Sequence, residues 1–297
     1  MAHTSVLLQT SIEGLDIKPG DIFLDGTLGG GGHSEEVLKR FGDSVTVIGI
    51  DLDLDAIERS RERLSKLSSR VTFKEGSFRN IDSILYDLGI SQVHKILLDI
   101  GTSSFQIEDS GRGFSFKTDE PLKMTLSKET PTGDVSARDV VNDWSEKSLA
   151  DIIFGFGEER YARKIAKAIV ERRLNQSIET TGDLVEIILK AVPASYRRGK
   201  IHPATRTFQA IRIAVNDELG ALKEGIEKGF KMLAPGGRMA VISFHSLEDR
   251  IVKDFFRQMK NDGKANLLTK KPIVPSQIEV SSNPRSRSAK MRIISKI

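Results

Sequence analysis

A glycine-rich loop directly after a short apolar run is the segment best suited to bind a ligand. Residues 25–33 read Asp-Gly-Thr-Leu-Gly-Gly-Gly-Gly-His and follow Ile-Phe-Leu at 22–24. Glycine lacks a Cβ and tolerates positive φ, so such a loop admits a ligand close to its main-chain N–H groups. A second apolar run, 45–50, ends at Asp51, where nucleotide-binding α/β units place an acid on ribose hydroxyls. Together the two segments predict an adenosine-containing cofactor.

The spacing of these residues favours S-adenosylmethionine over a nicotinamide dinucleotide. The dinucleotide fingerprint needs a glycine three places after Gly31, where this chain has Ser34. Enzymes that use S-adenosylmethionine instead carry an acid at the first loop, glycines for the methionine end and an acid after the second strand. Asp25, Gly29 to Gly32 and Asp51 supply them. The alternative is that the glycines form a flexible linker and that Asp51 caps a helix.

Further candidates follow the later strands. Phe78 comes just after a strand expected at 71–74 and could face an adenine ring or pack in the core. Residues 99–106, Asp-Ile-Gly-Thr-Ser-Ser-Phe-Gln, end the fourth expected strand. To methylate an exocyclic base amine, an enzyme must accept a hydrogen, stack on the base and align it. The residues that offer these roles are Asp99, Ser103, Ser104 and Phe105, and a plain polar turn is the alternative.

Two histidines are open to more than one interpretation. His245 follows the fifth expected strand, in Phe-His-Ser-Leu-Glu-Asp-Arg at 244–250, and could form a wall on the substrate side. Ser246 with Asp249 could equally cap the next helix, and capping is the reading we favour for Glu248 and Asp249. His33 could cap the helix after the glycine loop or touch the cofactor. Methyl transfer relieves the positive charge on sulfur, so the reaction requires neither a metal nor a covalent nucleophile. The chain has no cysteine and its five histidines lack close ligand spacing, so we expect no metal site.

Alternating apolar runs and helical patterns predict an α/β fold that brings these residues together. We expect strands at 22–25, 45–51, 71–74 and 95–100, with helices at about 34–41, 54–67 and 80–88. This alternation predicts a parallel sheet. Ligands lie outside the carboxyl ends of such strands. There Asp25, Asp51, Phe78 and Asp99 should converge in one crevice.

The alternation stops after the fourth strand and resumes a hundred residues later. The intervening segment is first rich in turn-forming residues and then has helical patterns, with a long amphipathic stretch at 157–174. The later pattern predicts a helix at about 207–233, a turn at 234–237, a strand at 238–244, a helix at 247–260 and a strand at 290–295. We therefore expect a discontinuous core, 1–106 and 207–297, with an inserted helical substrate-recognition domain at 107–206.

Composition and charge limit the class of protein and of partner. The chain has 297 residues, 38% hydrophobic and 29% charged, which is ordinary globular composition. We find no apolar run of membrane-spanning length and no charged-then-apolar leader, so we expect a cytoplasmic protein that does not bind membranes. The net charge is only +4, but eleven basic residues accompany six acidic ones between 157 and 206. Five more bases and no acid follow Pro284. The two segments predict contact with nucleic-acid phosphates, although solvated faces are the alternative.

The ordered motifs resemble the bacterial ribosomal RNA small subunit methyltransferase H family, also called MraW. The resemblance covers nearly the whole chain. It rests on residues 3–8 (His-Thr-Ser-Val-Leu-Leu), 25–27, 31–34, 99–104, 112–116 (Arg-Gly-Phe-Ser-Phe), 157–160 (Gly-Glu-Glu-Arg), 202–210 (His-Pro-Ala-Thr-Arg-Thr-Phe-Gln-Ala), 244–250 and 283–290. It implies a class I, Rossmann-like methyltransferase sheet with a helical insert. It also implies methyl transfer from S-adenosylmethionine to N4 of a decoding-centre cytidine in 16S rRNA, naked or in the assembled small subunit.

The resemblance also implies particular cofactor contacts. They fall on Gly31, Gly32, His33, Asp51, Phe78, Asp99 and Gln106. Two departures concern the substrate side: the family usually has proline at Phe105, and an acidic, arginine-containing stretch where residues 120–126 read Glu-Pro-Leu-Lys-Met-Thr-Leu. These departures leave open a cofactor-binding assembly factor with weak or lost methyl transfer. A small-molecule methyltransferase is a third reading, against which the basic insert argues. A homodimer also stays open.

Overall fold

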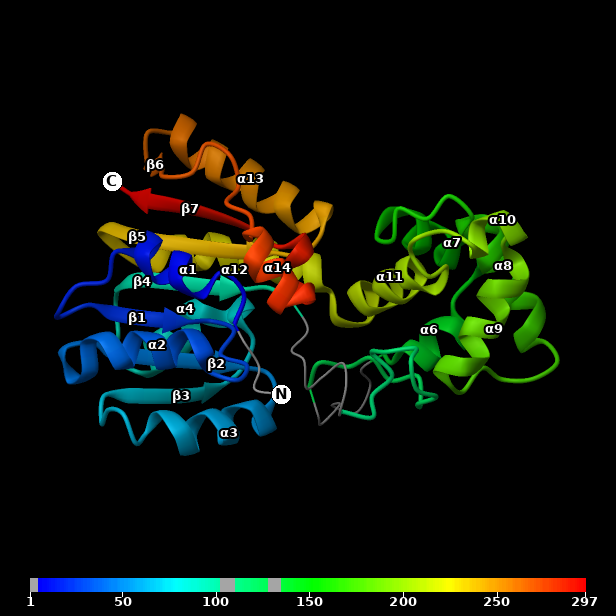
Figure 1. Ribbon diagram of the computed structural model, residues 1–297, viewed down its shortest axis with the longest axis horizontal. Helices are drawn as coiled ribbons and strands as arrows, with labels where there is room; N and C mark the ends of the chain where they lie inside the picture. Colours follow the sequence, from blue (N-terminus) through cyan, green and yellow to red (C-terminus); the bar gives the residue numbers. More distant parts are fainter. Residues whose placement is uncertain (1–4, 102–109, 128–134) are drawn as a thin grey trace. The chain divides into compact units, whose positions relative to one another are not determined.

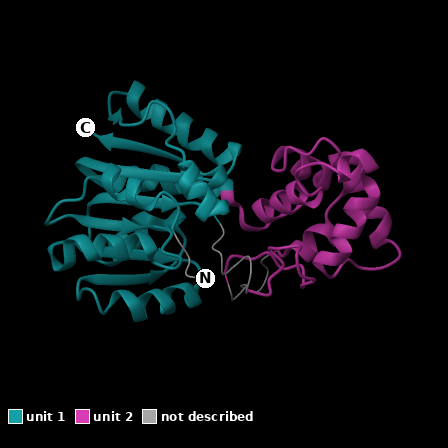
Figure 2. Ribbon diagram, viewed as in Figure 1, with its two compact units in different colours: residues 1–101, 219–297 teal, residues 102–218 magenta. Residues whose placement is uncertain are grey.

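The computed structural model describes residues 5–101, 110–127 and 135–297, which divide into two compact units. Unit 1 comprises residues 1–101 and 219–297, and unit 2 comprises residues 102–218 (Figure 2). The core is thus discontinuous in sequence. Unit 2 extends beyond the insert expected at 107–206, because the helix that starts at Ala204 belongs to it.

Unit 1 is built on a seven-stranded sheet with strand order β3-β2-β1-β4-β5-β7-β6 (Figure 1). The strands are β1 (Ile22–Asp25), β2 (Thr46–Asp51), β3 (Val71–Glu75), β4 (Val93–Asp99), β5 (Leu233–Ser243), β6 (Ala265–Leu267) and β7 (Lys290–Lys296). β1 to β5 pair in parallel, as the sequence predicts. β7 runs antiparallel to both β5 and β6, so the complete sheet is mixed rather than parallel.

Helices cover both faces of this sheet. They are α1 (Leu8–Leu15), α2 (Gly32–Phe41), α3 (Leu54–Leu64), α4 (Ile81–Asp87), α12 (Glu218–Met232), α13 (Ser246–Asn261) and α14 (Gln277–Ser282), with 3-10 turns η1 (Gly42–Ser44), η2 (Phe78–Asn80) and η3 (Pro284–Ser288). Ile96 and Leu98 of β4 join the core beneath α4, α12 and α13. Leu97 points to the other face and packs with α1 and α2. This alternation gives three layers, and the predicted α/β class is confirmed.

Two local predictions for unit 1 were wrong. The turn expected at 234–237 lies inside β5, where Leu233 pairs with Val93 and Arg238 pairs with Lys95, so the residues between them form a bulge. The helix expected at 207–233 is two helices, because Asp217 adopts a left-handed conformation with φ of 44° and ends the first of them. Residues 207–233 contain no proline, so the sequence does not mark the end of the first helix.

Unit 2 is helical. It contains α6 (Ala137–Asp143), α7 (Glu146–Gly155), α8 (Ala162–Arg173), α9 (Thr181–Ala191), α10 (Ala194–Arg197) and α11 (Ala204–Asn216). Ser136 with Asp139 and Thr180 with Asp183 form capping boxes that fix the starts of α6 and α9. Phe208 and Ile211 of α11 pack into the same apolar core as α7 and α8. α11 therefore belongs to this unit. In neither unit does a described helix have the length and apolarity needed to cross a membrane.

Candidate active site

Three carboxylates lie at the carboxyl ends of neighbouring strands. Asp51, Asp25 and Asp99 are the last residues of β2, β1 and β4, which are adjacent in the sheet. The register pairs Asp25 with Gly49 on one side and with Leu97 on the other. The strands therefore end at one edge, so the three acids share a single edge of unit 1, where the sequence predicts the crevice.

The glycine loop is held against the sheet by the side chains of Asp51 and Ser60. Gly29 and Gly31 have φ of 50° and 70°, the left-handed region that glycine tolerates. Asp51 Oδ2 accepts a hydrogen bond of 2.7 Å from the Gly29 N–H, and Ser60 Oγ donates to the Gly29 carbonyl at 2.9 Å. A Cβ on Gly32 would collide with the Ser5 hydroxyl. The loop is a built structure and not a flexible linker.

Asp51 does not cap a helix, contrary to the alternative interpretation. Asp53 is the N-cap of α3 and accepts from the Asp55 N–H at 3.1 Å. Asp51 instead holds the Gly29 N–H with one oxygen and the Asp53 N–H, at 2.9 Å, with the other. Burial raises its pKa, although both hydrogen bonds oppose the rise. Asp51 thus organises the glycine loop at the position where the sequence predicts a ribose contact.

Asp25 is buried beneath the glycine loop. Its carboxylate accepts 2.7 Å from the Ser34 hydroxyl and 3.3 Å from the Thr27 N–H. Burial raises the pKa of Asp25 to about 6, and the charge of Asp51 adds to the rise. Ser34 and Thr27 were not singled out by sequence reasoning, yet Ser34 occupies the place where a dinucleotide site needs glycine. Its hydroxyl explains that difference.

Asp99 is the least satisfied of the three acids. Its side chain is 21% exposed, and Nδ1 of the nearly buried His33 lies 3.9 Å from its Oδ2. Its other oxygen, Oδ1, is buried and has no hydrogen-bond partner in the part of the chain that the structure describes. Burial, then the charges of Asp25 and Glu248, raise the pKa of Asp99 to about 7. Such a carboxyl can hold or release a proton near neutrality.

His33 does not cap the helix that follows the loop, because Gly31 is the N-cap of α2 and His33 lies within its first turn. Its Nε2 lies 3.2 Å from the carbonyl of Val6. A carbonyl only accepts hydrogen bonds, so Nε2 carries a hydrogen and Nδ1 is the atom that faces Asp99. The Thr27 hydroxyl oxygen accepts from the Asp99 N–H at 2.7 Å, which links the glycine loop to β4.

His245 and Glu248 form the capping box of α13. The Glu248 N–H donates to His245 Nδ1, and Glu248 Oε2 accepts from the N–H groups of Phe244 and His245. Capping is therefore confirmed for Glu248 and wrong for Ser246 and Asp249, because His245 is the N-cap and Asp249 binds Arg292 with both carboxylate oxygens, at 2.7 and 3.1 Å. The imidazole of His245 already has this structural role, and a substrate contact for it stays a prediction.

Phe78 begins η2 and is half-buried. Its ring packs against α12, where a Cβ on Gly225 would lie 2.5 Å from Phe78 Cδ2. It also belongs to the edge of the core beneath α4 and α12. An adenine contact stays a prediction. Four further candidates, Ser103, Ser104, Phe105 and Gln106, lie outside the described residues.

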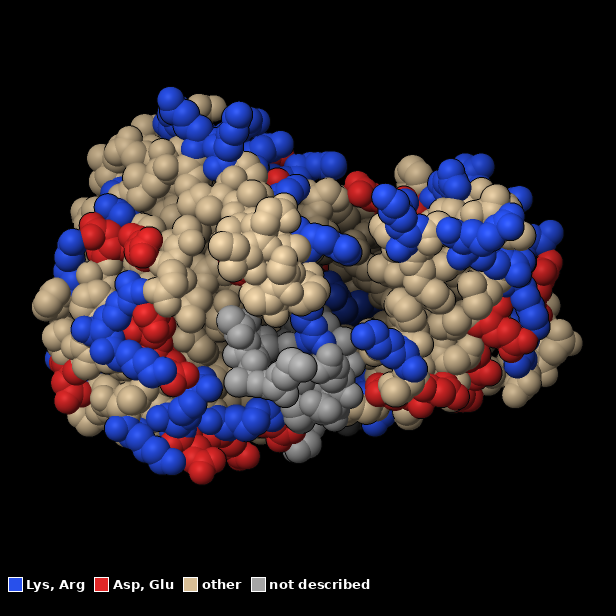
Figure 3. Space-filling model, in the orientation of Figure 1, with Lys and Arg blue, Asp and Glu red and all other residues tan. Residues whose placement is uncertain are grey.

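The basic residues of unit 2 gather around two tyrosines. In Figure 3, Lys and Arg side chains gather over the part of unit 2 that holds α8 and α10. The guanidinium carbon of Arg160 lies 4.9 and 4.8 Å from the ring centroids of Tyr161 and Tyr196. The Tyr196 hydroxyl donates to fully buried Glu159 at 2.5 Å. Burial of the hydroxyl is the larger cause, and this hydrogen bond the smaller, of a rise in the pKa of Tyr196 to about 12. We call Arg160, Arg163, Lys164, Arg197, Arg198 and Lys200 the unit 2 basic patch.

The predicted second basic edge is smaller than its sequence suggests. Arg292 is bound to Asp249, and Lys290 Nζ lies 3.8 Å from the same carboxylate. Lys296 Nζ donates to the carbonyls of Lys231 and Leu233. These contacts hold β7 in place. Only Arg285 and Arg287 of the five are exposed residues.

The residues present fit S-adenosylmethionine. The sulfonium and amino groups of that cofactor are cationic, and this edge holds buried carboxylates with raised pKa values and an unpartnered Asp99 oxygen. A Cβ built on Gly30 would meet nothing within 4 Å, so the loop is open at that residue. A sheet with a glycine loop after β1 and acids after β1, β2 and β4 defines a Rossmann-like methyltransferase.

Comparison with known proteins gives the family. The model of the MraW methylase family matches residues 1–297, and the chain belongs to this family. A Ruminiclostridium cellulolyticum protein named ribosomal RNA small subunit methyltransferase H is 48% identical over 312 residues, which cover 99% of each chain. A protein of the same name from Brevibacillus brevis is 44% identical over 310 residues, 99% of this chain and 98% of that one. The predicted family and cofactor, S-adenosylmethionine, are thereby confirmed.

Proposed function

We propose that this methyltransferase transfers a methyl group from S-adenosylmethionine to N4 of a decoding-centre cytidine, of the cytidine 1402 type, in 16S rRNA. The names of its relatives support the small-subunit RNA as substrate. The observation that carries the reaction is Asp99 at the carboxyl end of β4, a half-buried carboxyl whose buried Oδ1 has no hydrogen-bond partner among the described residues. The place of action would be the cytoplasm.

Asp99 would serve as the acceptor for a hydrogen of the cytidine amine. The lone pair of an exocyclic amine is delocalised into the ring, so the amine is a weak nucleophile until an acceptor draws on its hydrogen. The bound cofactor supplies an electrophilic methyl group on its sulfonium. With a pKa of about 7, Asp99 can take a proton and return it to solvent in the same pH range. His33 Nδ1 lies 3.9 Å from Asp99 Oδ2 and carries no hydrogen when Nε2 donates to Val6, so it would interact with Asp99 once that carboxyl has taken the proton.

The other edge residues would bind the cofactor and not react. Asp25 and Asp51 hold the first loop through Ser34, Thr27 and Gly29, so their charges stay fixed beside the glycines. Preorganised charges require little rearrangement when a cation binds, which favours alignment for transfer. Gly31 and Gly32 pack against Ser60 and Ser5 and would shape the loop, whereas the open side of Gly30 would let the methionine end approach the backbone.

Unit 2 would bind the RNA. Its basic patch offers phosphate contacts, and the half-buried rings of Tyr161 and Tyr196 offer stacking surfaces beside Arg160. A cytidine must leave its stack to reach a crevice at a sheet edge, and such base-modifying enzymes unstack their target. Contact with the backbone and the shape of the RNA would dominate affinity.

The test is to identify the methylated nucleoside. Small ribosomal subunits that lack N4-cytidine methylation would be incubated with the protein and radiolabelled S-adenosylmethionine, and the RNA digested and separated by chromatography. Labelled N4-methylcytidine is the expected result. Label in another nucleoside would contradict the proposed target, and cofactor binding without any label would favour the assembly-factor reading.

A further inference from the structure

A small pocket in unit 1 is lined by cations that the reaction does not use. It is a shallow hollow, open to solvent, between α13 and the segment that joins β6 to β7. The charged residues that line it are Lys253, Arg257, Lys270 and Arg292, and no carboxylate lines it. Phe256, 2% exposed, and half-buried Leu267 form its apolar part.

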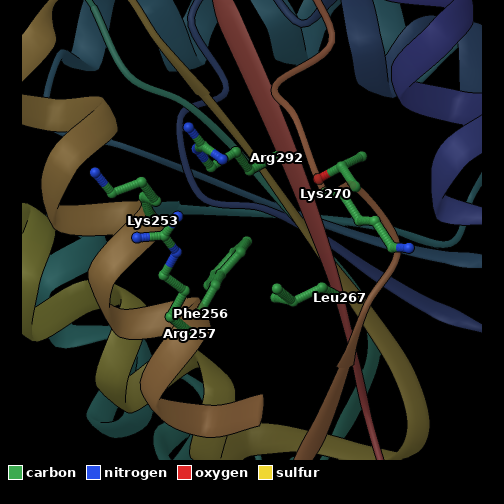
Figure 4. A pocket seen from close by; sticks show the side chains of 7 residues that line it. Lys253, Phe256, Arg257, Leu267, Lys270 and Arg292 are labelled. Carbon is green, nitrogen blue, oxygen red and sulfur yellow. The ribbon is translucent and has the colours of Figure 1, made fainter. Parts of the chain in front are cut away.

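The cationic ends of three of these residues lie on one side of the pocket. Figure 4 shows the nitrogen atoms of Lys253, Arg257 and Arg292 on that side, whereas the Lys270 ammonium extends away from them. Lys253 and Arg257 are four residues apart on α13, so they share one helix face. Like charges on one face repel unless an anion lies between them.

Arg292 is held in place rather than neutralised completely. It is only 8% exposed, and its Nε and Nη2 bind Asp249. Its Nη1 makes no hydrogen bond within the described part of the chain, so one donor is left for a ligand. Lys253 approaches exposed Asp254 at 3.8 Å, a weak surface pair. Arg257 has no carboxylate partner among the described residues.

Thr269 adds a neutral donor. Its hydroxyl oxygen accepts from the Ile293 N–H at 3.0 Å, so the hydroxyl hydrogen stays available for a ligand. The pocket thus offers a guanidinium nitrogen with a fixed position, a second guanidinium, an ammonium and a hydroxyl. Planar guanidinium groups and lysine ammonium groups are the usual partners of phosphate oxygens.

We infer that this pocket binds a phosphate group, and that the group belongs to the backbone of the RNA substrate. The pocket is open and lies on a side of unit 1 where Lys and Arg side chains gather along α13 (Figure 3). An open site of this kind suits a phosphate that arrives on a long polyanion. The inference rests on the proposed function in taking RNA as substrate, and it gives unit 1 an RNA contact apart from unit 2.

The test compares two double variants with equal changes in charge. Lys253→Ala with Arg257→Ala removes the two α13 cations of the pocket. Lys66→Ala with Arg70→Ala removes an exposed lysine and arginine beside the amino end of β3, at the opposite edge of the sheet. Affinity for a 16S rRNA fragment would be measured by fluorescence anisotropy at several salt concentrations, with S-adenosylmethionine binding as the check on folding.

We expect the pocket variant to bind the fragment about tenfold more weakly, with a log–log salt slope shallower by about 0.7–0.9, because the pocket holds one phosphate and each lost phosphate contact removes about that much. The control variant should match the wild type. RNA binding by the pocket variant equal to that of the control would overturn the inference. The inference would also be overturned if inorganic phosphate binds the pocket but the pocket variant binds RNA as the wild type does. The pocket would then hold a free phosphate ion and not a phosphate of the RNA backbone.

The measurement separates this inference from the proposed function, because RNA binding is read without methyl transfer. If the wild type binds the fragment and the pocket variant does not, but no methyl group is ever transferred, the pocket assignment stands and the proposed function fails. If the wild type methylates the RNA and both variants bind it equally, only the pocket assignment fails.

Discussion

Among single residues, Asp25 and Asp99 are sheet-edge acids whose pKa values are strongly raised, and they contribute to the response to pH. Asp25 and Asp99 titrate at about 6 and about 7 in the folded protein, against an ordinary value of 3.8. The folded state therefore holds more protons than the unfolded chain between about pH 4 and 7. Its free energy of unfolding falls as pH rises through this window.

Asp99→Asn should remove part of this pH dependence. The amide has no charge to bury, so the variant gains stability relative to the wild type at pH 8 and little at pH 4. Urea unfolding of both proteins at the two pH values measures the difference. The same difference at both pH values would show that the pKa of Asp99 is not raised.

Cofactor affinity should depend on the same protons. A cation binds the ionised carboxylates best, so S-adenosylmethionine should bind more tightly at pH 8 than at pH 5.5 and should release protons on binding. S-adenosylhomocysteine lacks the sulfonium charge and should respond less. Calorimetry in two buffers of different ionisation enthalpy counts the protons. Equal proton release by the two ligands would contradict a carboxylate beside the sulfonium.

At the scale of elements, α12 positions Phe78. Gly225→Ala would favour the helix by its intrinsic propensity, about 1 kcal/mol. Its Cβ, however, would lie 2.5 Å from the Phe78 ring and 3.0 Å from the Phe78 carbonyl oxygen. Overpacking of this kind costs about 1–3 kcal/mol. We expect net destabilisation and weaker cofactor binding.

The matched control for this experiment is Lys223→Ala, an exposed position on the same helix. Thermal unfolding and cofactor titration of both variants give the answer. If Gly225→Ala is as stable as Lys223→Ala but binds cofactor as the wild type does, the ring has room to move and Phe78 has no fixed role in the site.

The elements that position the site could largely be predicted, for a physical reason. Parallel strands buried on both faces are short apolar runs, and each of β1, β2 and β4 ends at an acid that marks the sheet edge. α1 could not be predicted, because its N-cap is Leu7 in a left-handed conformation and no side chain caps the start of the helix. β6 could not be predicted either, because a strand of only three residues is too short to show an alternating pattern.

Contacts between distant residues could not be predicted from the sequence. The bond from Ser34 to Asp25, the approach of His33 to Asp99 and the link from Thr27 to β4 need the loop folded against the sheet. The basic tail shows the same limit. Its charge count suggests a free surface, whereas Arg292 and Lys296 bind groups of their own unit.

At the scale of the whole molecule, the charge of unit 2 should govern RNA affinity. Arg197, Arg198 and Lys200 are exposed and form no ion pair in the described part of the chain. Replacing all three by alanine should make the salt slope of RNA binding shallower by about 2, at about 0.7 per contact. The slope is measured by anisotropy between low and physiological salt.

Three other lysines give a matched control. Lys147, Lys167 and Lys190 each lie within 4 Å of an acid four residues away on the same helix. Their replacement by alanine makes the same charge change and should leave the slope closer to that of the wild type. Equal slopes for the two triple variants would contradict a specific patch. A turnover that does not depend on salt would favour a small-molecule substrate.

Methyl transfer to a cytidine of the small-subunit RNA should depend on Asp99. The most direct test of this dependence is the single-turnover rate of wild type and Asp99→Asn at pH 8, with saturating cofactor and unmethylated small subunits. We expect a rate lower by about 10²–10⁴ in the variant, the usual contribution of a positioned general base. A variant rate within about threefold of the wild type would contradict it.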